Sequence, residues 1–337
     1  MTAETFAIMP GASMRNIIIT SAGRRVTLVR IFQKELSRSF PGAKVICTDA
    51  NPELSSACHA ASRFFALPLM HDPNYAPALL KVARKEGVGL IIPTIDQSLP
   101  ILANNREKFR EEGIELLVSD MPFIKQCRDK RLTSTFFLEH GIPVPAFLDR
   151  SNLHFPLFVK PYDGSSSSGA KLIPHESSLT KEQLADERLL FVEAIDRDLY
   201  DEFTVDMYYT REGELTCAVP RKRIEVRAGE VSKGVTIKND IVDYLKERLG
   251  RVSGARGCIT LQLFRHKDKP EYYGIEINAR FGGGFPLTYG SGANFPAWII
   301  HEYFLDERPP VFDAWQENLL MLRYDEEVFV RNYSDHH

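Results

Sequence analysis

Short apolar runs alternate with helical segments between Arg15 and about Val118, and this alternation constrains the fold of the region more than any other feature. The runs NIIIT, AKVICTD, LIIPTID and IELLVSD are typical of strands, while VTLVRIFQKELSRSF and YAPALLKVARKEG have helical spacing. Strands that alternate with helices predict a parallel, doubly wound sheet.

The turn after the first strand bears on nucleotide binding. It holds a single glycine, Gly23, so the G-x-G-x-x-G fingerprint of dinucleotide binding is absent. Asp49 ends the second strand, where dinucleotide-binding folds often hold a ribose. Without the glycines, a structural role for Asp49 in the loop is favoured, and a nucleotide-dependent oxidoreductase is disfavoured.

The pattern changes after about residue 120. Ser119 is the expected N-cap of a helix with Pro122 in its first turn, and a second helix is expected over residues 130–140. Strand-like stretches then follow with few long helices between them, which predicts an α+β region with antiparallel sheets. These stretches are residues 156–160, 170–174, 188–195, 203–210, 215–226, 258–265 and 272–280.

Composition narrows the class of protein. The 337 residues suffice for about two or three domains, and a net charge of −3 does not favour nucleic acid or a membrane surface as a partner. No apolar run approaches the roughly 18 residues of a membrane span. The opening MTAETFAIMPGAS lacks the features of a signal peptide, so residues 1–13 are expected to be a flexible leader. Five scattered cysteines without C-x-x-C indicate reduced thiols and a cytoplasmic location.

The stretch LFVKPYDGSSSSGAKLI contains a loop of small residues between two expected strands. Small residues between Asp163 and Gly169 let backbone N–H groups approach a ligand closely and form an anion-binding concavity. Lys160, directly before the loop, favours phosphate as that anion. The sequence is not a Walker A loop, because no GK[ST] follows. A flexible, solvated hairpin is the alternative.

The stretch YYGIEINAR places Glu276, Asn278 and Arg280 on one face of a strand, because side chains alternate with period two. The preceding strand CITLQLFR carries Gln262 on its polar face, and HKDKPE between the two strands predicts a hairpin. If Gln262 faces Glu276, a carboxylate and two amide oxygens converge, and these hard donors suit Mg²⁺. An amphipathic strand that shows polar residues to water is the alternative.

The order and spacing of these motifs resemble the ATP-grasp superfamily, and in particular the branch of the carbamoyl phosphate synthetase large subunit. The similarity spans nearly the whole chain from Met14, with VKPYDGSSSSG and EINARFGGG as its motifs. It implies a combined α/β and α+β fold. A Rossmann-like pre-ATP-grasp domain is expected at residues 14–120, linker helices and a lid at 121–192, and an ATP-grasp core at 193–337.

The resemblance implies ATP and two Mg²⁺ ions as cofactors, with Mn²⁺ as an alternative metal. The residues implied for the triphosphate are Lys130, Lys160 and a closing loop of Gly164, Ser165, Ser166, Ser167, Ser168 and Gly169. Those implied for adenosine are a hinge of Glu193, Ala194 and Ile195 at the adenine and Glu202 at the ribose, with Asp201 as a rival. Gln262, Glu276 and Asn278 are implied as metal ligands, and Arg280 as a catalytic residue beside the γ-phosphate.

A basic segment follows the expected hinge. It contains Arg221, Lys222, Arg223, Arg227 and Lys233, and strand alternation puts Arg221 and Arg223 on one face and Lys222 on the other. Either these residues form a solvated edge, or one or two of them clamp the γ-phosphate or an acid substrate. Arg223 is the favoured clamp and the second expected catalytic residue.

The resemblance implies a ligase that activates a carboxylic acid as an acyl phosphate and couples it to an amine or amino acid. The chain has one such unit where carbamoyl phosphate synthetase has two, and glycines follow Arg280 in place of the usual small hydroxyl residues. Bicarbonate and carbamoyl phosphate are therefore not favoured. A kinase-like enzyme with a phosphorylated product and a non-catalytic ATP-binding regulator are the alternatives. The expected partners are small molecules, with no nucleic acid or membrane, and a homodimer is allowed. Ser21, Arg24, Asp96 and the glycine run are candidates for the substrate pocket by position only.

Overall fold

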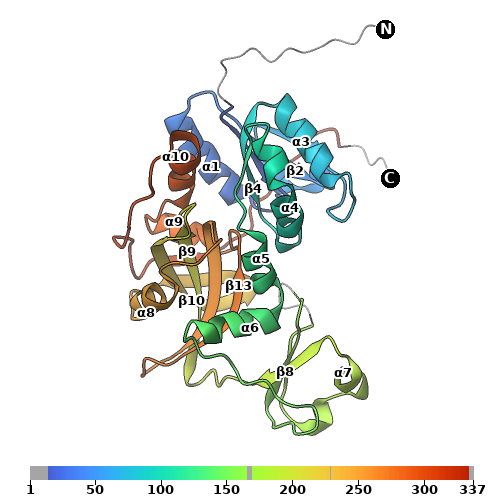
Figure 1. Ribbon diagram of the computed structural model, residues 1–337, viewed down its shortest axis with the longest axis vertical. Helices are drawn as coiled ribbons and strands as arrows, with labels where there is room; N and C mark the ends of the chain where they lie inside the picture. Colours follow the sequence, from blue (N-terminus) through green and yellow to red (C-terminus); the bar gives the residue numbers. More distant parts are fainter. Residues whose placement is uncertain (1–13, 165–168, 228, 334–337) are drawn as a thin grey trace. The chain divides into compact units, whose positions relative to one another are not determined.

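The computed structural model describes residues 14–164, 169–227 and 229–333, and the chain divides into two compact units (Figure 1). Unit 1 extends to Ile92 and includes Asn105–Leu116, whereas unit 2 consists of Pro93–Asn104 and the chain from Leu117 onward. Residues 93–104, which the sequence analysis places in the first domain, therefore cluster with the second unit.

Unit 1 contains a five-stranded sheet in the order β3-β2-β1-β4-β5. β1 pairs with β2, β2 with β3, and β4 with β5, all in parallel, which confirms the predicted doubly wound sheet. The strands are β1 (Asn16–Thr20), β2 (Val45–Asp49), β3 (Arg63–Ala66), β4 (Val88–Pro93) and β5 (Glu115–Leu116). The helical segments are α1 (Val26–Ser39), η1 (Pro52–Leu54), α2 (Ser56–Ala60) and α3 (Tyr75–Lys85), with η2 (Asp96–Ser98) and α4 (Leu99–Arg110) after β4.

Asp49 has a structural role in this unit, as the sequence favours. Its Oδ2 accepts a hydrogen bond from the Gly23 N–H at 3.0 Å, and its Oδ1 accepts one from the Asn51 N–H at 3.3 Å. Gly23 has a φ of +50°, which suits glycine. The carboxylate thus holds the turn after β1 in place.

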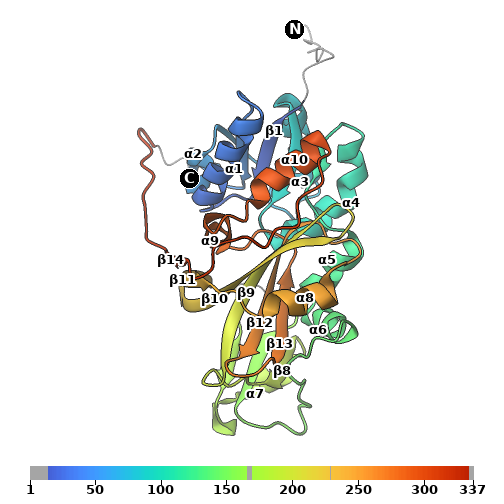
Figure 2. The same cartoon turned by 90° about the vertical axis from the view of Figure 1, so that its left-hand side faces the viewer.

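Unit 2 is built on a six-stranded sheet in the order β13-β12-β9-β10-β11-β14. The strand pairings are antiparallel, as predicted for this half of the chain. The strands are β9 (Tyr200–Tyr209), β10 (Leu215–Arg227), β11 (Glu230–Thr236), β12 (Gly257–His266), β13 (Tyr272–Asn278) and β14 (Leu320–Leu322). Figure 2 shows α8 (Ile241–Leu249) beside this sheet.

A smaller antiparallel sheet in the order β7-β6-β8 has a core of its own, formed by Leu157, Val159, Ile173 and Phe191. Its elements are β6 (Leu157–Pro161), β7 (Lys171–Ile173), η3 (Glu176–Ser178), α7 (Lys181–Ala185) and β8 (Leu189–Glu193). Because β6 and β7 flank residues 162–170, this sheet holds both ends of the small-residue loop.

The remaining helices of unit 2 pack on the larger sheet: α5 (Met121–Arg128) and α6 (Lys130–Glu139) on β13, and α9 (Phe285–Gly290) and α10 (Phe295–Leu305) on β10–β12. The N-cap of α5 is Asp120 rather than the predicted Ser119. Ser119 is buried, and its hydroxyl accepts a hydrogen bond from the Arg256 N–H at 3.2 Å instead. Among the described residues, the helices are too short or too polar to cross a membrane.

Candidate functional site

The neighbouring strands β13, β12 and β9 of the larger sheet align a set of polar side chains on one face. Gln262 on β12 lies opposite Glu276 on β13, and Thr260 lies opposite Asn278. On the other side of β12, Gln262 pairs with Thr204 of β9. The predicted hairpin and its register are thus present, with Lys269 in the loop between the two strands.

Glu276 lies at the centre of this face. Its Oε1 accepts hydrogen bonds from Gln262 Nε2 at 2.7 Å and from Asn278 Nδ2 at 3.0 Å. The Oε1 atom of Gln262 accepts from Arg223 Nη1 at 2.9 Å, and the Oδ1 atom of Asn278 accepts from Arg280 Nη2 at 3.1 Å. Each amide is therefore held between a guanidinium and the same carboxylate. The amide nitrogens face Glu276 and the amide oxygens face Arg223 and Arg280, so the three side chains come together as expected but the two amide oxygens do not converge on the carboxylate.

Arg280 is held by Asp96, which the sequence analysis offers as a candidate by position only. Asp96 Oδ2 accepts from Arg280 Nη2 at 2.8 Å and from Nε at 3.1 Å. Both side chains are largely buried, with exposed fractions of 16% and 18%. Asp96 thus fixes the guanidinium that the sequence assigns to the γ-phosphate.

Lys160 on β6 is 9% exposed. Burial and the positive charge of Lys130 lower the pKa of Lys160 to about 8, while Glu276 acts in the opposite direction. The two lysines and the central carboxylate therefore lie close enough to influence one another electrostatically.

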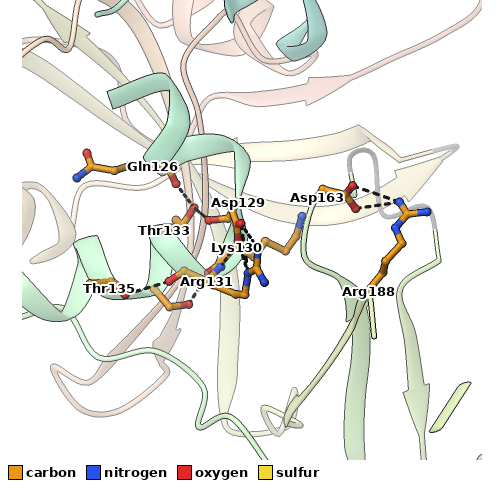
Figure 3. A network of polar contacts seen from close by, with 9 residues as sticks. Gln126, Asp129, Lys130, Arg131, Thr133, Thr135, Asp163 and Arg188 are labelled. Carbon is orange, nitrogen blue, oxygen red and sulfur yellow. Dashed lines mark hydrogen bonds and ion pairs between the residues drawn. The ribbon is translucent and has the colours of Figure 1, made fainter. Parts of the chain in front are cut away.

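Lys130 is the first residue of α6, placed there because Asp129 caps the helix and accepts from the Arg131 N–H at 2.9 Å. The Lys130 ammonium donates to the carbonyl oxygen of Gly164, and Figure 3 shows its side chain extending toward this loop. The adjacent Asp163 forms an ion pair with Arg188 at 3.0 Å. Ser165–Ser168 lie outside the described residues, while Gly169 has a φ of +73°.

A pocket joins these residues. Its lining comes from the helices that precede the small sheet, from the start of the loop and from β13: Asp96, Gln97, Cys127, Arg128, Lys130, Asp163, Gly164, Glu276, Ile277 and Asn278. No group of three or more His, Cys, Asp or Glu side chains that could hold a metal ion is found in the described part of the chain. The ligands expected from the sequence are one carboxylate and two amides, and oxygen donors of this kind fit Mg²⁺ better than a soft metal.

The residues expected at adenosine lie where the small sheet leads into the larger one. The Glu193 N–H donates to Ala146 O at 2.9 Å, whereas the backbone N–H groups of Ala194 and Ile195 have no protein acceptor among the described residues. These two groups are therefore available to a ligand such as a purine edge.

Glu202 and its rival Asp201 have different partners. Glu202 forms ion pairs with Arg223 and, at 3.3 Å, with Arg197. Asp201 accepts from Lys222 Nζ at 2.6 Å. Since neighbouring residues of a strand point to opposite faces, Glu202 shares the face of Gln262 and Asp201 does not. This favours Glu202 over Asp201 for a role at the site.

The three glycines after Arg280 each lie against a polar side chain. A Cβ atom would come within 3.0 Å of Thr260 Oγ1 at Gly282, 2.8 Å of Glu230 Oε1 at Gly283, and 2.1 Å of Arg221 Nη1 at Gly284. The run thus needs glycine because it packs directly on these side chains.

Two residues around this run, Asp206 and Arg323, were not expected from the sequence, whereas Arg221 belongs to the basic segment named there. Arg221, 1% exposed, forms a fully buried ion pair with Asp206 at 2.9 Å. Arg323 donates to the carbonyl oxygen of Gly283 and to Glu230 at 2.6 Å. Asp206 could have been found as an acid in the otherwise apolar strand FTVDMYYT, whereas no local pattern marks Arg323.

Comparison with protein families gives two matches. Residues 187–326 match the family model described as ATP-grasp in the biosynthetic pathway with Ter operon, and residues 17–117 match the PylC-like N-terminal domain. Residues 187–326 are therefore an ATP-grasp region. The first match contains the hinge, Glu202, the three expected metal ligands and Arg280. Since neither matched family is carbamoyl phosphate synthetase, that finer likeness remains a resemblance.

Solved structures share this ATP-grasp fold at low sequence identity. Pyruvate carboxylase from Rhizobium etli is 14% identical with a TM-score of 0.64, and the match covers 85% of this chain but only 28% of that one. The biotin carboxylase domain of Hydrogenobacter thermophilus 2-oxoglutarate carboxylase, solved with MgADP, ADP and bicarbonate, is 13% identical with a TM-score of 0.68. That match covers 90% of this chain and 73% of the other.

L-amino acid ligase from Bacillus licheniformis is 20% identical to this chain, with a TM-score of 0.64. The match covers 88% of this chain and 77% of the ligase. At identities this low, the structural likeness shows the fold alone. The roles of individual residues must be argued from the geometry above.

Proposed function

We propose that this protein is an ATP-dependent carboxylate–amine ligase that forms an acyl phosphate and releases ADP and phosphate. The observation that carries the proposal is the arrangement around Glu276, a carboxylate that accepts hydrogen bonds from the amides of Gln262 and Asn278. Glu276 and Asn278 line a pocket together with Lys130. Solved proteins of this fold include an L-amino acid ligase and a biotin carboxylase domain with bound MgADP, which supports ATP-dependent ligation.

In this proposal the nucleotide lies along the polar face of the larger sheet. Ala194 and Ile195 contact the adenine edge, Glu202 accepts hydrogen bonds from the ribose hydroxyls, and Lys130 and Lys160 contact the phosphates. Gln262, Glu276 and Asn278 hold Mg²⁺, which neutralises phosphate charge when bound.

The chain's own residues act chiefly by positioning and by electrostatic stabilisation. A carboxylate oxygen of the acid attacks the γ-phosphorus, the bond from phosphorus to the bridging oxygen breaks, and ADP leaves. The amine nitrogen then attacks the acyl carbon, phosphate leaves with the C–O bond electrons, and the nitrogen loses a proton. Arg280, held by Asp96, offsets the charge on the transferred group in both steps.

ATP consumption measured against a matrix of carboxylic acids and amines tests this proposal. ADP and phosphate are expected in equal amounts and only when an acid and an amine are both present, apart from slow leakage. Hydroxylamine is expected to replace the amine and to trap the acyl phosphate as a hydroxamate. ADP release without phosphate, together with an isolated phosphorylated product, would establish a kinase instead.

A variant pair ties the activity to the site. Glu276→Ala is expected to abolish Mg²⁺-dependent turnover, because the two amides lose the carboxylate that orients them. Glu247→Ala, at an exposed position on α8, is expected to keep full turnover. Normal turnover in a folded Glu276→Ala protein would contradict the metal assignment.

A further inference from the structure

Arg223 contacts two residues to which the proposed function gives different tasks. Its guanidinium forms an ion pair with Glu202, the proposed ribose acid. The same Nη1 atom donates to Oε1 of Gln262, a proposed metal ligand, at 2.9 Å. One planar cation therefore connects the ribose end of the site to its metal end.

The ion pair between Arg223 and Glu202 is largely shielded from solvent. The side chains of Arg223 and Glu202 are only 11% and 16% exposed, so water screens their charges weakly. The Nε atom of Arg223 is buried and has no hydrogen-bond partner in the described parts of the chain. Because one Nη1 atom donates to both Glu202 and Gln262, a movement of the guanidinium toward one partner changes its contact with the other.

We propose that Arg223 is a positioning residue that couples ribose recognition to metal affinity. Ribose hydroxyls that donate to Glu202 fix this carboxylate, which fixes the guanidinium and thereby the oxygen of Gln262. Gln262 in turn donates to Glu276 at 2.7 Å, so the orientation reaches the central carboxylate. Such coupling is reciprocal, so the metal is expected to strengthen ribose recognition by the same factor. The inference rests on the proposed function.

The adjacent residue provides a matched control. Lys222 forms an ion pair with Asp201 at 2.6 Å, from the neighbouring positions of the same two strands but on the opposite face. Its removal deletes a comparable interaction between β9 and β10 without touching Glu202 or Gln262. If loss of an ion pair between β9 and β10 were enough to change metal affinity, substitution of Lys222 would have the same effect as substitution of Arg223.

The test measures nucleotide binding by calorimetry, with ATP and with 2′,3′-dideoxy-ATP, over a series of Mg²⁺ concentrations. For the wild-type protein, removal of the hydroxyls is expected to raise the Mg²⁺ concentration at half-saturation by about five-fold or more, in the usual range of site–site coupling. In Arg223→Met this factor is expected to approach one. Arg223→Lys is expected to lose most of it, because one ammonium cannot reproduce the planar fork. Lys222→Met is expected to keep the wild-type factor.

Each other outcome has a defined meaning. Wild-type protein that fails to bind ATP would overturn the proposed function itself. If the wild-type protein binds ATP and 2′,3′-dideoxy-ATP with the same Mg²⁺ concentration at half-saturation, the proposed coupling is wrong but the proposed function is not. The same holds if the coupling persists in a folded Arg223→Met or Arg223→Lys protein, or if Lys222→Met abolishes it equally.

Discussion

Lys160 is a buried lysine whose charge depends on its neighbours. Burial and the charge of Lys130 lower the pKa of Lys160 to about 8. Near that pH, about half of the Lys160 side chains in the ligand-free protein are therefore protonated. Bound phosphates favour the charged form. We therefore expect binding of Mg·ATP near pH 8 to take up roughly half a proton at Lys160.

Calorimetry in buffers with different ionisation enthalpies measures this proton uptake. Lys160→Met is expected to abolish most of it, whereas Lys171→Met, at an exposed position on β7, is expected to keep it. An uptake that persists in Lys160→Met would assign the proton to another group.

The same shift affects stability in a defined direction. The pKa of Lys160 falls from its ordinary 10.5 to about 8 on folding, so between these values the unfolded chain binds more protons. Stability contributed by this residue is therefore greatest above 10.5 and is lost as the pH falls through about 8. The wild-type protein should gain stability relative to Lys160→Met as the pH rises from about 7.5 to about 9.5.

Gly284 is the position where the glycine run meets the buried Arg221. A Cβ there would come within 2.1 Å of Arg221 Nη1, although the φ of −85° itself suits any residue. Gly284→Ala is expected to lower the free energy of unfolding by about 1–3 kcal/mol, as overpacking does. Gly290→Ala serves as the control, because a Cβ there would meet Leu319 at an ordinary contact distance of 3.5 Å. It should change the free energy of unfolding by less than about 0.5 kcal/mol. Denaturant unfolding measures both, and equal effects would contradict the packing argument.

At the scale of elements, β14 adds the last strand to the larger sheet and places Arg323 beside the glycine run of residues 282–284. It pairs with β11 from Lys233 to Val235, and the Arg323 N–H donates to Ser232 O at 2.9 Å. The Arg323 side chain then reaches Glu230 and Gly283. The end of the described chain thus holds the glycine run against the sheet.

We expect Arg323→Ala to accelerate hydrogen exchange of residues 281–284 and to lower stability by about 1–3 kcal/mol, because a charge-assisted contact to Gly283 is lost. Arg227→Ala removes an exposed ion pair to Asp325 on the same segment and should change stability by less than about 1 kcal/mol. Mass spectrometry of peptides that contain these residues measures the exchange. Unchanged hydrogen exchange of residues 281–284 in Arg323→Ala would contradict the idea that Arg323 holds the glycine run in place.

The sequence predicts some of these elements better than others, for physical reasons. The β12–β13 hairpin could be predicted because alternation and a polar loop are local signals, and they also fix Gln262 opposite Glu276. β14 has only three residues on a sheet edge, too few for a periodic pattern. The ion pair of Arg280 with Asp96 joins residues 184 positions apart in the chain, so no local pattern encodes it.

At the scale of the whole molecule, the two units have separate sheets, and every residue of the proposed nucleotide site belongs to unit 2. Mg·ATP at about 100 times its dissociation constant should stabilise the state that binds it by about 2.7 kcal/mol. Slowed hydrogen exchange is expected in β9, β12 and β13. Peptides from β1 and β2 should gain less protection, and equal protection in both sheets would show that the units unfold together.

Asp96 belongs to unit 2 but is encoded inside the sequence of unit 1. A gene recombination that joined a foreign N-terminal domain at Leu117 would inherit Arg280 but lose the carboxylate that holds it. A crossover before Pro93 would keep Asp96 but also carry along Asn105–Leu116, which belongs to the other unit. No single crossover separates the two units, so the halves of this gene cannot be exchanged as independent cassettes unless the incoming domain brings an acidic side chain to the same place.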